Sequence, residues 1–144
     1  GMQVIFIDQL SQIGNKQIKG GELTSLYTEN CTRISRLKKE LGIPIFLLCQ
    51  LNRDMKNRST KEPILTDLKQ SGKIEEDADA VLFIHRPEEY SDPDEDKISL
   101  SGKTILNIAK NRSGSKFRDN RIIFNHKTTY FYQEEDSWGD YDRE

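Results

Sequence analysis

The chain has 144 residues, of which 34% are hydrophobic and 32% are charged, and its net charge is −2. This length suits one domain, and the charged share exceeds the roughly 25% of an ordinary globular chain, so we expect a thin core. No apolar run approaches the roughly 18 residues of a membrane-spanning helix, no signal peptide is visible, and Cys31 and Cys49 lack disulfide or metal spacing. These features indicate a reduced, cytoplasmic protein without a membrane partner.

The first part of the chain predicts a strand–helix–strand unit. Residues 4–7 form an apolar run typical of a strand covered on both faces, and residues 11–21 are a polar loop. Apolar residues three and four positions apart predict a helix over 22–41, which Gly42 ends. Residues 45–49 form a second apolar run, so two parallel strands joined by a right-handed helical crossover are expected.

The rest of the chain predicts two more strands and a hairpin. In order, the expected segments are a basic loop (52–63), a short and partly helical stretch (66–78), a strand (81–84), a loose acidic segment (88–102), a strand (104–109), a basic loop (110–120), and two hairpin strands (122–124 and 129–132). The prediction is therefore an α/β fold with a mostly parallel sheet and a C-terminal β-hairpin. Residues 2–133 form the folded portion, and residues 134–144 form an acidic tail.

Charge is segregated along the chain. Residues 33–73 have a net charge of +6, residues 75–98 of −8, and residues 103–127 of +6. Two basic segments in a nearly neutral chain suggest a phosphate-rich partner, although such runs are more often solvated surfaces.

Polar residues follow the predicted strands, where ligands bind in an open parallel sheet. Asp8 follows four apolar residues, as in a Walker B strand whose carboxylate orients Mg²⁺ on a nucleotide, although an Asp there is more often a turn or helix cap. Gln50 could contact a γ-phosphate or the attacking water, or bond to the backbone. Lys110 and Arg112 precede Ser-Gly and could act on a phosphate across a subunit boundary, or lie in a solvated loop.

Four sequence blocks make the interpretation more specific. They are Ile-Asp-Gln-Leu at 7–10, Gln-Leu-Asn-Arg at 50–53, Asp-Leu-Lys-Gln-Ser-Gly-Lys-Ile-Glu-Glu-Asp-Ala-Asp at 67–79, and Lys-Asn-Arg-Ser-Gly at 110–114. With these blocks in this order, the chain resembles the C-terminal half of the RecA-like motor domain of DnaB-type replicative DNA helicases, from about residue 3 to 132. The block at 67–79 is the most specific of the four.

The resemblance implies a partial RecA-like P-loop NTPase fold that uses ATP with Mg²⁺. It implies that Asp8 serves Mg²⁺, that Gln50 senses the γ-phosphate, and that Lys110 and Arg112 act on the nucleotide of a neighbouring subunit. A final group of residues would hold the backbone of DNA in a channel loop: Lys69, Gln70 and Gly72. Lys69 stands where the family usually has Arg and Gln70 where it has Glu, and a Lys keeps the charge but loses the bidentate fork.

The phosphate-binding motif Gly-x-x-x-x-Gly-Lys-Ser/Thr is absent from these 144 residues, as is the family's catalytic Glu. We therefore expect the isolated chain to be inactive. The parent protein implied by the resemblance is a hexameric ring of identical subunits that couples ATP hydrolysis to translocation on single-stranded DNA and to unwinding. Primase and a helicase loader are its further implied partners. Two alternatives are a non-catalytic DNA- or partner-binding remnant of a helicase gene and a fragment of a recombinase-like ATPase, which the block at 67–79 disfavours.

Overall fold

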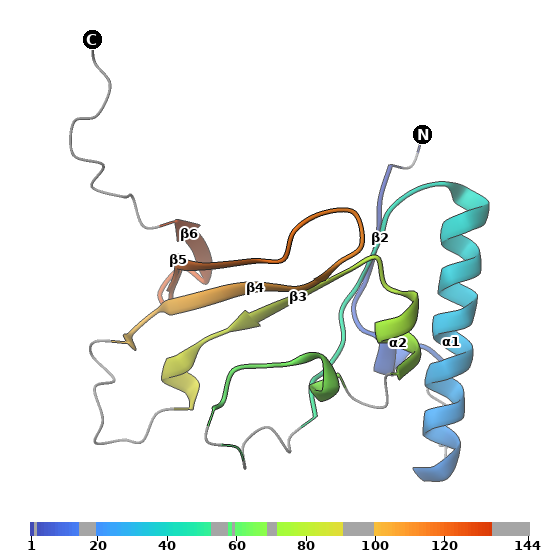
Figure 1. Ribbon diagram of the computed structural model, residues 1–144, viewed down its shortest axis with the longest axis horizontal. Coiled ribbons are helices and arrows are strands. Elements are labelled where there is room, and N and C mark those ends of the chain that lie inside the picture. Colours follow the sequence, from blue (N-terminus) through green and yellow to red (C-terminus); the bar gives the residue numbers. More distant parts are fainter. Residues whose placement is uncertain are drawn as a thin grey trace. The chain divides into compact units, whose positions relative to one another are not determined.

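The structure, a computed structural model, describes most of the chain and contains two compact units, Gly1–Val81 and Leu82–Glu144 (Figure 1). The described residues are 1, 3–14, 20–52, 58, 60–68, 72–90 and 100–133; the side chains of 20–23 and 120 are outside the description. The predicted tail at 134–144 therefore lies outside it. In the described part, no helix is both long and apolar enough to cross a bilayer.

The first unit contains the predicted strand–helix–strand arrangement. Strand β1 (Ile5–Ile7) pairs in parallel with β2 (Ile45–Leu47), and helix α1 (Gly20–Leu41) lies between them in sequence. A parallel pair needs a connection of a dozen or more residues, which α1 supplies. The helix ends as predicted at Gly42, whose φ of +64° suits a glycine and whose N–H donates to the carbonyl of Lys38 at 3.0 Å.

One face of α1 forms the core of this unit. Leu10, Tyr27 and Cys31 are buried there. Asn30 is only 5% exposed, and its Nδ2 donates to the carbonyl of Ile13 at 3.1 Å. This bond satisfies a buried amide and fixes the segment after β1 against the helix. Half-buried apolar side chains surround this core: Ile13, Ile34, Leu47, Cys49 and Ile74.

The expectation that both strands are covered on both faces is wrong for β1 and β2. Phe6 is 67% exposed and Phe46 is 51% exposed, and their rings stack with centroids 5.0 Å apart. Within the described part of this unit, the core around α1 packs against Leu47 and Cys49 on one face. In each of these strands, only every second apolar residue therefore faces the core.

The predicted mostly parallel sheet is also wrong. A four-stranded sheet has the order β3 (Ala80–His85), β4 (Lys103–Asn111), β5 (Phe117–Asn125) and β6 (Tyr130–Gln133). Both β4–β5 and β5–β6 are antiparallel, because the short connections between them can only reverse the chain. The β5–β6 pair confirms the expected C-terminal hairpin.

The basic loop expected at 110–120 is largely strand. Lys110 and Asn111 complete β4, β5 begins at Phe117, and only residues 112–116 connect the two strands. Arg118 is exposed and pairs in register with Asn107. Strands with a solvated face accommodate charged residues, so charge alone did not mark a loop here.

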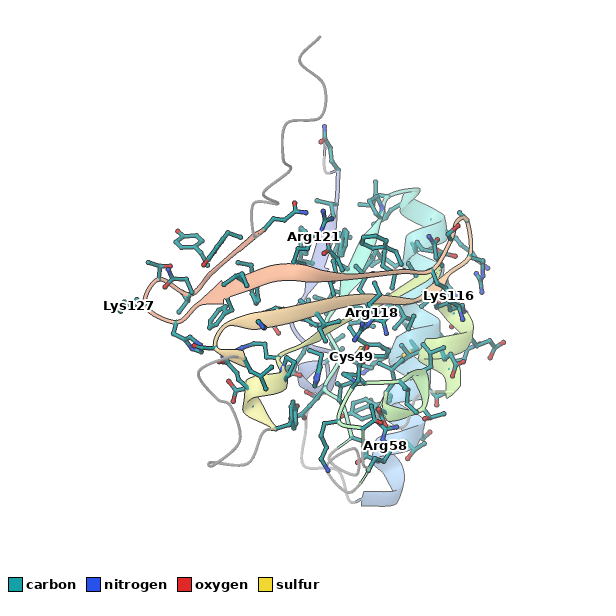
Figure 2. The ribbon with its side chains drawn as sticks, turned by 60° about the vertical axis from the view of Figure 1, so that its left-hand side comes forward. Cys49, Arg58, Lys116, Arg118, Arg121 and Lys127 are labelled. Atoms are coloured by element: carbon teal, nitrogen blue, oxygen red, sulfur yellow. The ribbon has the colours of Figure 1, made fainter. Side chains whose placement is uncertain are left out.

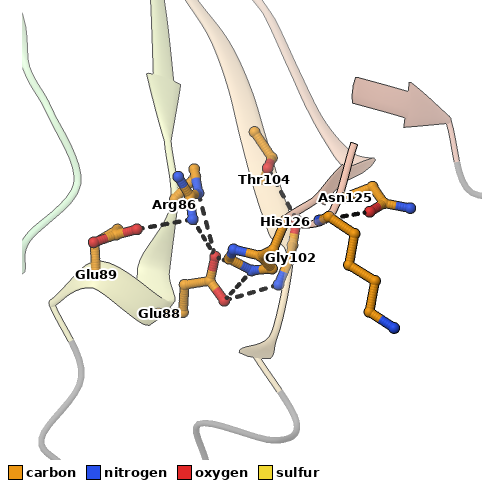
Figure 3. A network of polar contacts seen from close by, with 8 residues as sticks. Arg86, Glu88, Glu89, Gly102, Thr104, Asn125 and His126 are labelled. Atoms are coloured by element: carbon orange, nitrogen blue, oxygen red, sulfur yellow. Dashed lines mark hydrogen bonds and ion pairs between the residues drawn. The ribbon is translucent and has the colours of Figure 1, made fainter. Parts of the chain in front are cut away.

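The described ends of the acidic segment 88–102 are ordered rather than loose. A 3₁₀ turn covers Pro87–Glu89, and the Glu88 carboxylate joins three parts of the second unit (Figure 3). It accepts a hydrogen bond from the N–H of Gly102 at 2.9 Å, pairs with Arg86 at 2.7 Å, and contacts Nε2 of His126 at 3.1 Å. Arg86 also lies 4.2 Å from the ring centre of Phe124. Residues 91–99 lie outside the described part.

Candidate functional site

Asp8 and Gln50 lie at the same end of the parallel pair. Asp8 directly follows β1, and the pairing continues past the strands through the N–H of Leu48, which donates to the carbonyl of Ile7 at 3.0 Å. The N–H of Leu10 then donates to the carbonyl of Leu48 at 3.0 Å. Both predicted residues therefore lie beyond the carboxyl ends of adjacent strands, where open sheets bind ligands.

Asp8 and Gln50 also belong to the same face. Exposure alternates from Val4 to Asp8 and from Phe46 to Gln50, and both polar residues are exposed like the stacked phenylalanines that precede them. Since alternate side chains of a strand share a face, the carboxylate and the amide extend from the open side of the pair. That side is accessible to a ligand.

A carboxylate and an amide oxygen lie at this edge, and such donors suit a magnesium ion that also binds water and substrate phosphates. Among the described residues, no group of three or more His, Cys, Asp or Glu side chains could hold a metal ion. Mg²⁺ is commonly bound through one or two carboxylates, with water and substrate phosphates completing its coordination. Asp8 can supply one carboxylate of that kind.

The predicted DNA loop is described only at its flanks. Lys69 and Gln70 lie outside the described residues, whereas Gly72 is the first residue of α2 (Gly72–Asp77). A Cβ added at Gly72 would meet nothing within 4 Å, so the backbone there is open to close approach. α2 and the 3₁₀ turn Leu65–Asp67 confirm the partly helical stretch expected at 66–78.

The base of this loop is hydrogen bonded to the segment that carries Gln50. Leu51 forms an antiparallel bridge with Leu68, and the N–H of Asn52 donates to the carbonyl of Asp67 at 2.7 Å. The Asp67 carboxylate is buried; it accepts from Arg58 at 2.6 Å and from the N–H of Ile64 at 2.9 Å. The Arg58–Asp67 pair was not predictable from the sequence, because nothing in the local pattern marks partners nine residues apart.

Lys110 and Arg112 lie together in the second unit. Lys110 is half-buried near the end of β4, and Arg112 is the exposed first residue of the loop that follows. Figure 2 shows Lys116 and Arg118 near this loop and Lys127 at the opposite end of β5, so the basic charge is spread along the strand. Asp8 and Gln50 belong to the first unit, and each predicted pair is thus brought together within its own unit.

A short sequence in the second unit matches the last three residues of the P-loop motif. Gly102, Lys103 and Thr104 read Gly-Lys-Thr, but Lys97 stands where the motif needs its first glycine. Lys103 and Thr104 lie in β4 instead of at the start of a helix. Thr104 is 1% exposed, and its hydroxyl donates to the carbonyl of Gly102 at 3.1 Å. These residues therefore stabilise a strand and form no phosphate cradle.

Comparison with known proteins identifies the family. The model of the DnaB-like helicase C-terminal domain matches residues 1–133. The chain belongs to this family. It is 36% identical over 138 residues to a probable plasmid replicative DNA helicase of Chlamydia psittaci, covering 96% of this chain and 29% of that protein.

Two solved structures resemble the fold of this DnaB-like chain. A DnaB-like replicative helicase, described with its interactions with primase, superposes with a TM-score of 0.72 at 26% identity, over 89% of this chain and 29% of that one. A second solved structure, of an ATPase domain, gives a TM-score of 0.69 at 27% identity, over 92% of this chain and 44% of that one. The predicted resemblance and the RecA-like fold class are thereby confirmed, and the chain spans well under two thirds of these relatives.

Proposed function

We propose that this DnaB-like chain is part of a replicative helicase motor that couples ATP hydrolysis to movement on single-stranded DNA and to duplex unwinding. The observation that carries the proposal is the position of Asp8 and Gln50, on one face and at one end of a parallel strand pair. The proposal concerns the complete protein, because the chain spans 29% of the curated relative described above.

In this proposal, the two residues have different tasks at one nucleotide. The Asp8 carboxylate binds the metal of MgATP, and the Gln50 amide contacts the γ-phosphate or the attacking water. Bound Mg²⁺ would neutralise charge on the phosphates. Because these 144 residues contain no Gly-x-x-x-x-Gly-Lys-Ser/Thr motif, we expect the isolated chain to release no phosphate from ATP.

Lys110 and Arg112 would act on the nucleotide of the neighbouring subunit in a ring of six. An exposed guanidinium at the start of a loop can reach outward, and its planar fork matches phosphate oxygens. Lys69, Gln70 and Gly72 would hold the backbone of single-stranded DNA, with residues 2–133 as the folded portion and 134–144 as an acidic tail. The complete protein would work in the cytoplasm with primase and a helicase loader; one similar solved structure is described with primase.

The decisive test is a mixed-ring experiment on the complete protein. We expect Arg112→Ala to leave nucleotide binding intact and to reduce ATP hydrolysis by about 10³-fold or more, as arginine fingers do. Arg112→Lys should restore little, because an ammonium lacks the fork. Rings that mix Arg112→Ala subunits with subunits disabled in their own P-loop should regain activity that neither pure ring has. A pure Arg112→Ala ring with full hydrolysis would contradict the finger assignment.

A further inference from the structure

The side chain of Asn111 forms hydrogen bonds across the loop that carries Arg112. Asn111 ends β4, and its Oδ1 accepts a hydrogen bond from the N–H of Ser113 at 3.2 Å. Its Nδ2 donates to the carbonyl of Ser115 at 3.1 Å. The amide is therefore hydrogen bonded to Ser113 and Ser115, on either side of Gly114. These bonds hold the loop that contains Arg112 against the end of β4.

Gly114 makes room for this arrangement. A Cβ added at Gly114 would lie 2.9 Å from Nδ2 of Asn111 and 3.6 Å from its Cγ. Any side chain there would push the amide away from the turn. Asn111, the last residue of β4, and Gly114, in the connection between β4 and β5, thus act together to shape this loop.

This closure matters because the loop lies at the surface. Residues 112 to 116 are all exposed, whereas Asn111 itself is half-buried in the strand. An arginine finger has to present its guanidinium in one position, and a displacement of about 1 Å in a reacting group can cost about 100-fold in rate. An Asx-type side chain that bonds to the backbone two residues on is a known way to fix a turn.

We propose that Asn111 is a positioning residue for Arg112, which holds the guanidinium where it meets the neighbouring subunit's nucleotide. This proposal rests on the proposed function, because it presumes that Arg112 acts as a finger. In this proposal Asn111 acts through its hydrogen bonds to Ser113 and Ser115 and not directly on the nucleotide. Its effect on hydrolysis therefore runs entirely through the loop.

The second hairpin turn of the same sheet supplies a matched control. Asn125, labelled in Figure 3, accepts two hydrogen bonds with its Oδ1 atom, from the N–H of Lys127 at 2.9 Å and from the N–H of Thr128 at 3.2 Å. Asn125→Ala thus removes the same kind of turn bond from the other end of β5. It should affect the stability of the sheet without affecting the finger.

The test measures ATP hydrolysis, nucleotide binding and ring assembly in the complete protein. We expect Asn111→Ala to lower kcat by about 10- to 100-fold, with nucleotide binding and ring assembly within about twofold of the parent. Asn111→Ser, which keeps an oxygen able to accept the Ser113 N–H, should restore part of the loss. Gly114→Ala should resemble Asn111→Ala, because it displaces the amide without removing it. Asn125→Ala should keep kcat within about twofold of the parent, since its turn lies away from the finger.

A double variant separates this proposal from the proposed function. If Asn111 acts only through the finger, Asn111→Ala should cause no further loss in a ring that already carries Arg112→Ala. Should Arg112→Ala itself leave hydrolysis intact, the finger assignment fails. Should Arg112→Ala lower hydrolysis to a measurable residual rate while Asn111→Ala costs no more than Asn125→Ala, or while the two losses multiply in the double variant, the positioning role of Asn111 is overturned.

Discussion

At the scale of single residues, the two cysteines should be unreactive while the chain is folded. Burial raises the pKa of the Cys31 thiol to about 11, with the nearby Asp77 carboxylate adding to the effect. Burial likewise raises the pKa of Cys49 to about 11. At pH 8 only about one thiol in a thousand is then ionised, and the thiolate is the reactive form.

We therefore expect alkylation by iodoacetamide at pH 8 to be roughly 100-fold slower in the native chain than in denaturant, where the pKa of a free thiol is about 8.5. Mass spectrometry at timed intervals would follow both sites separately. Rapid native labelling of Cys49 would show that the core beside β2 opens easily. Cys31→Ser and Cys49→Ser chains identify the two sites independently.

Residues with a local signature were predictable, and residues whose role depends on loop closure were not. Asp8 and Gln50 each follow an apolar run, so their place at the end of a strand followed from the pattern alone. The hydrogen bonds of Asn111 depend on where the turn returns to β5, and the Arg58–Asp67 ion pair depends on how a coil folds back. No spacing rule describes either contact.

At the scale of elements, substitution by alanine should cost much more stability at one glycine than at another. Gly102 has a φ of +72°, and a Cβ there would lie 2.5 Å from the carbonyl oxygen of Phe124. The N–H of Phe124 donates to the carbonyl of Gly102 at 2.7 Å, so the two backbones cannot separate without breaking the start of the β4–β5 pair. Gly72, at the start of α2, has open space around it.

Gly102→Ala should destabilise the chain by about 2 kcal/mol or more, because it combines backbone strain with a backbone clash. Gly72→Ala should change stability by less than about 1 kcal/mol, since alanine favours a helix. Thermal unfolding of both variants checks this difference. In the complete protein, Gly72→Ala should nevertheless weaken binding of single-stranded DNA if the backbone there meets a phosphate. Equal losses of stability in the two variants would contradict the prediction.

The types of most elements were predictable, but their pairing was less so. The spacing of apolar residues identified α1 almost to its ends, and glycine marked where it stops. The orientation of the second sheet was missed because the basic residues of 110–120 concealed the ends of two strands. With those ends assigned correctly, a five-residue connection would have indicated an antiparallel pair.

At the scale of the whole molecule, stability should decline in acid. Burial by itself raises the pKa of Glu88, but hydrogen bonds from Arg86, the Gly102 N–H and His126 outweigh it and hold this pKa below its ordinary value. A carboxyl whose folded pKa is depressed stabilises the fold above its unfolded pKa, near 4.5 here, and loses that contribution as pH falls through the folded pKa. Asp77 acts in the same direction: burial raises its pKa, and bonds from Lys73 and Ser35 outweigh that effect and lower it.

Urea unfolding at pH 7, 5 and 3 would measure this contribution. We expect the midpoint to fall most between pH 5 and pH 3, and we expect the difference between the parent chain and Glu88→Gln to be largest at pH 7 and to shrink toward pH 3. Glu89→Gln provides a control, because Glu89 pairs with Arg86 at 2.8 Å from a more exposed position. A constant difference across this pH range would mean that the Glu88 carboxylate contributes no pH-dependent stability.

The connections of the two sheets also bear on the order in which the chain folds. Residues 126–129 join β5 to β6 and residues 112–116 join β4 to β5, so these strands can meet after closing very short loops. Ile5 can pair with Ile45 only after the much longer connection that contains α1 has closed. Loop-closure entropy grows with the length of chain enclosed, and local contacts form fastest. The meander β4–β5–β6 should therefore form before the parallel pair β1–β2, and the edge that carries Asp8 and Gln50 should be among the last parts of the chain to take shape.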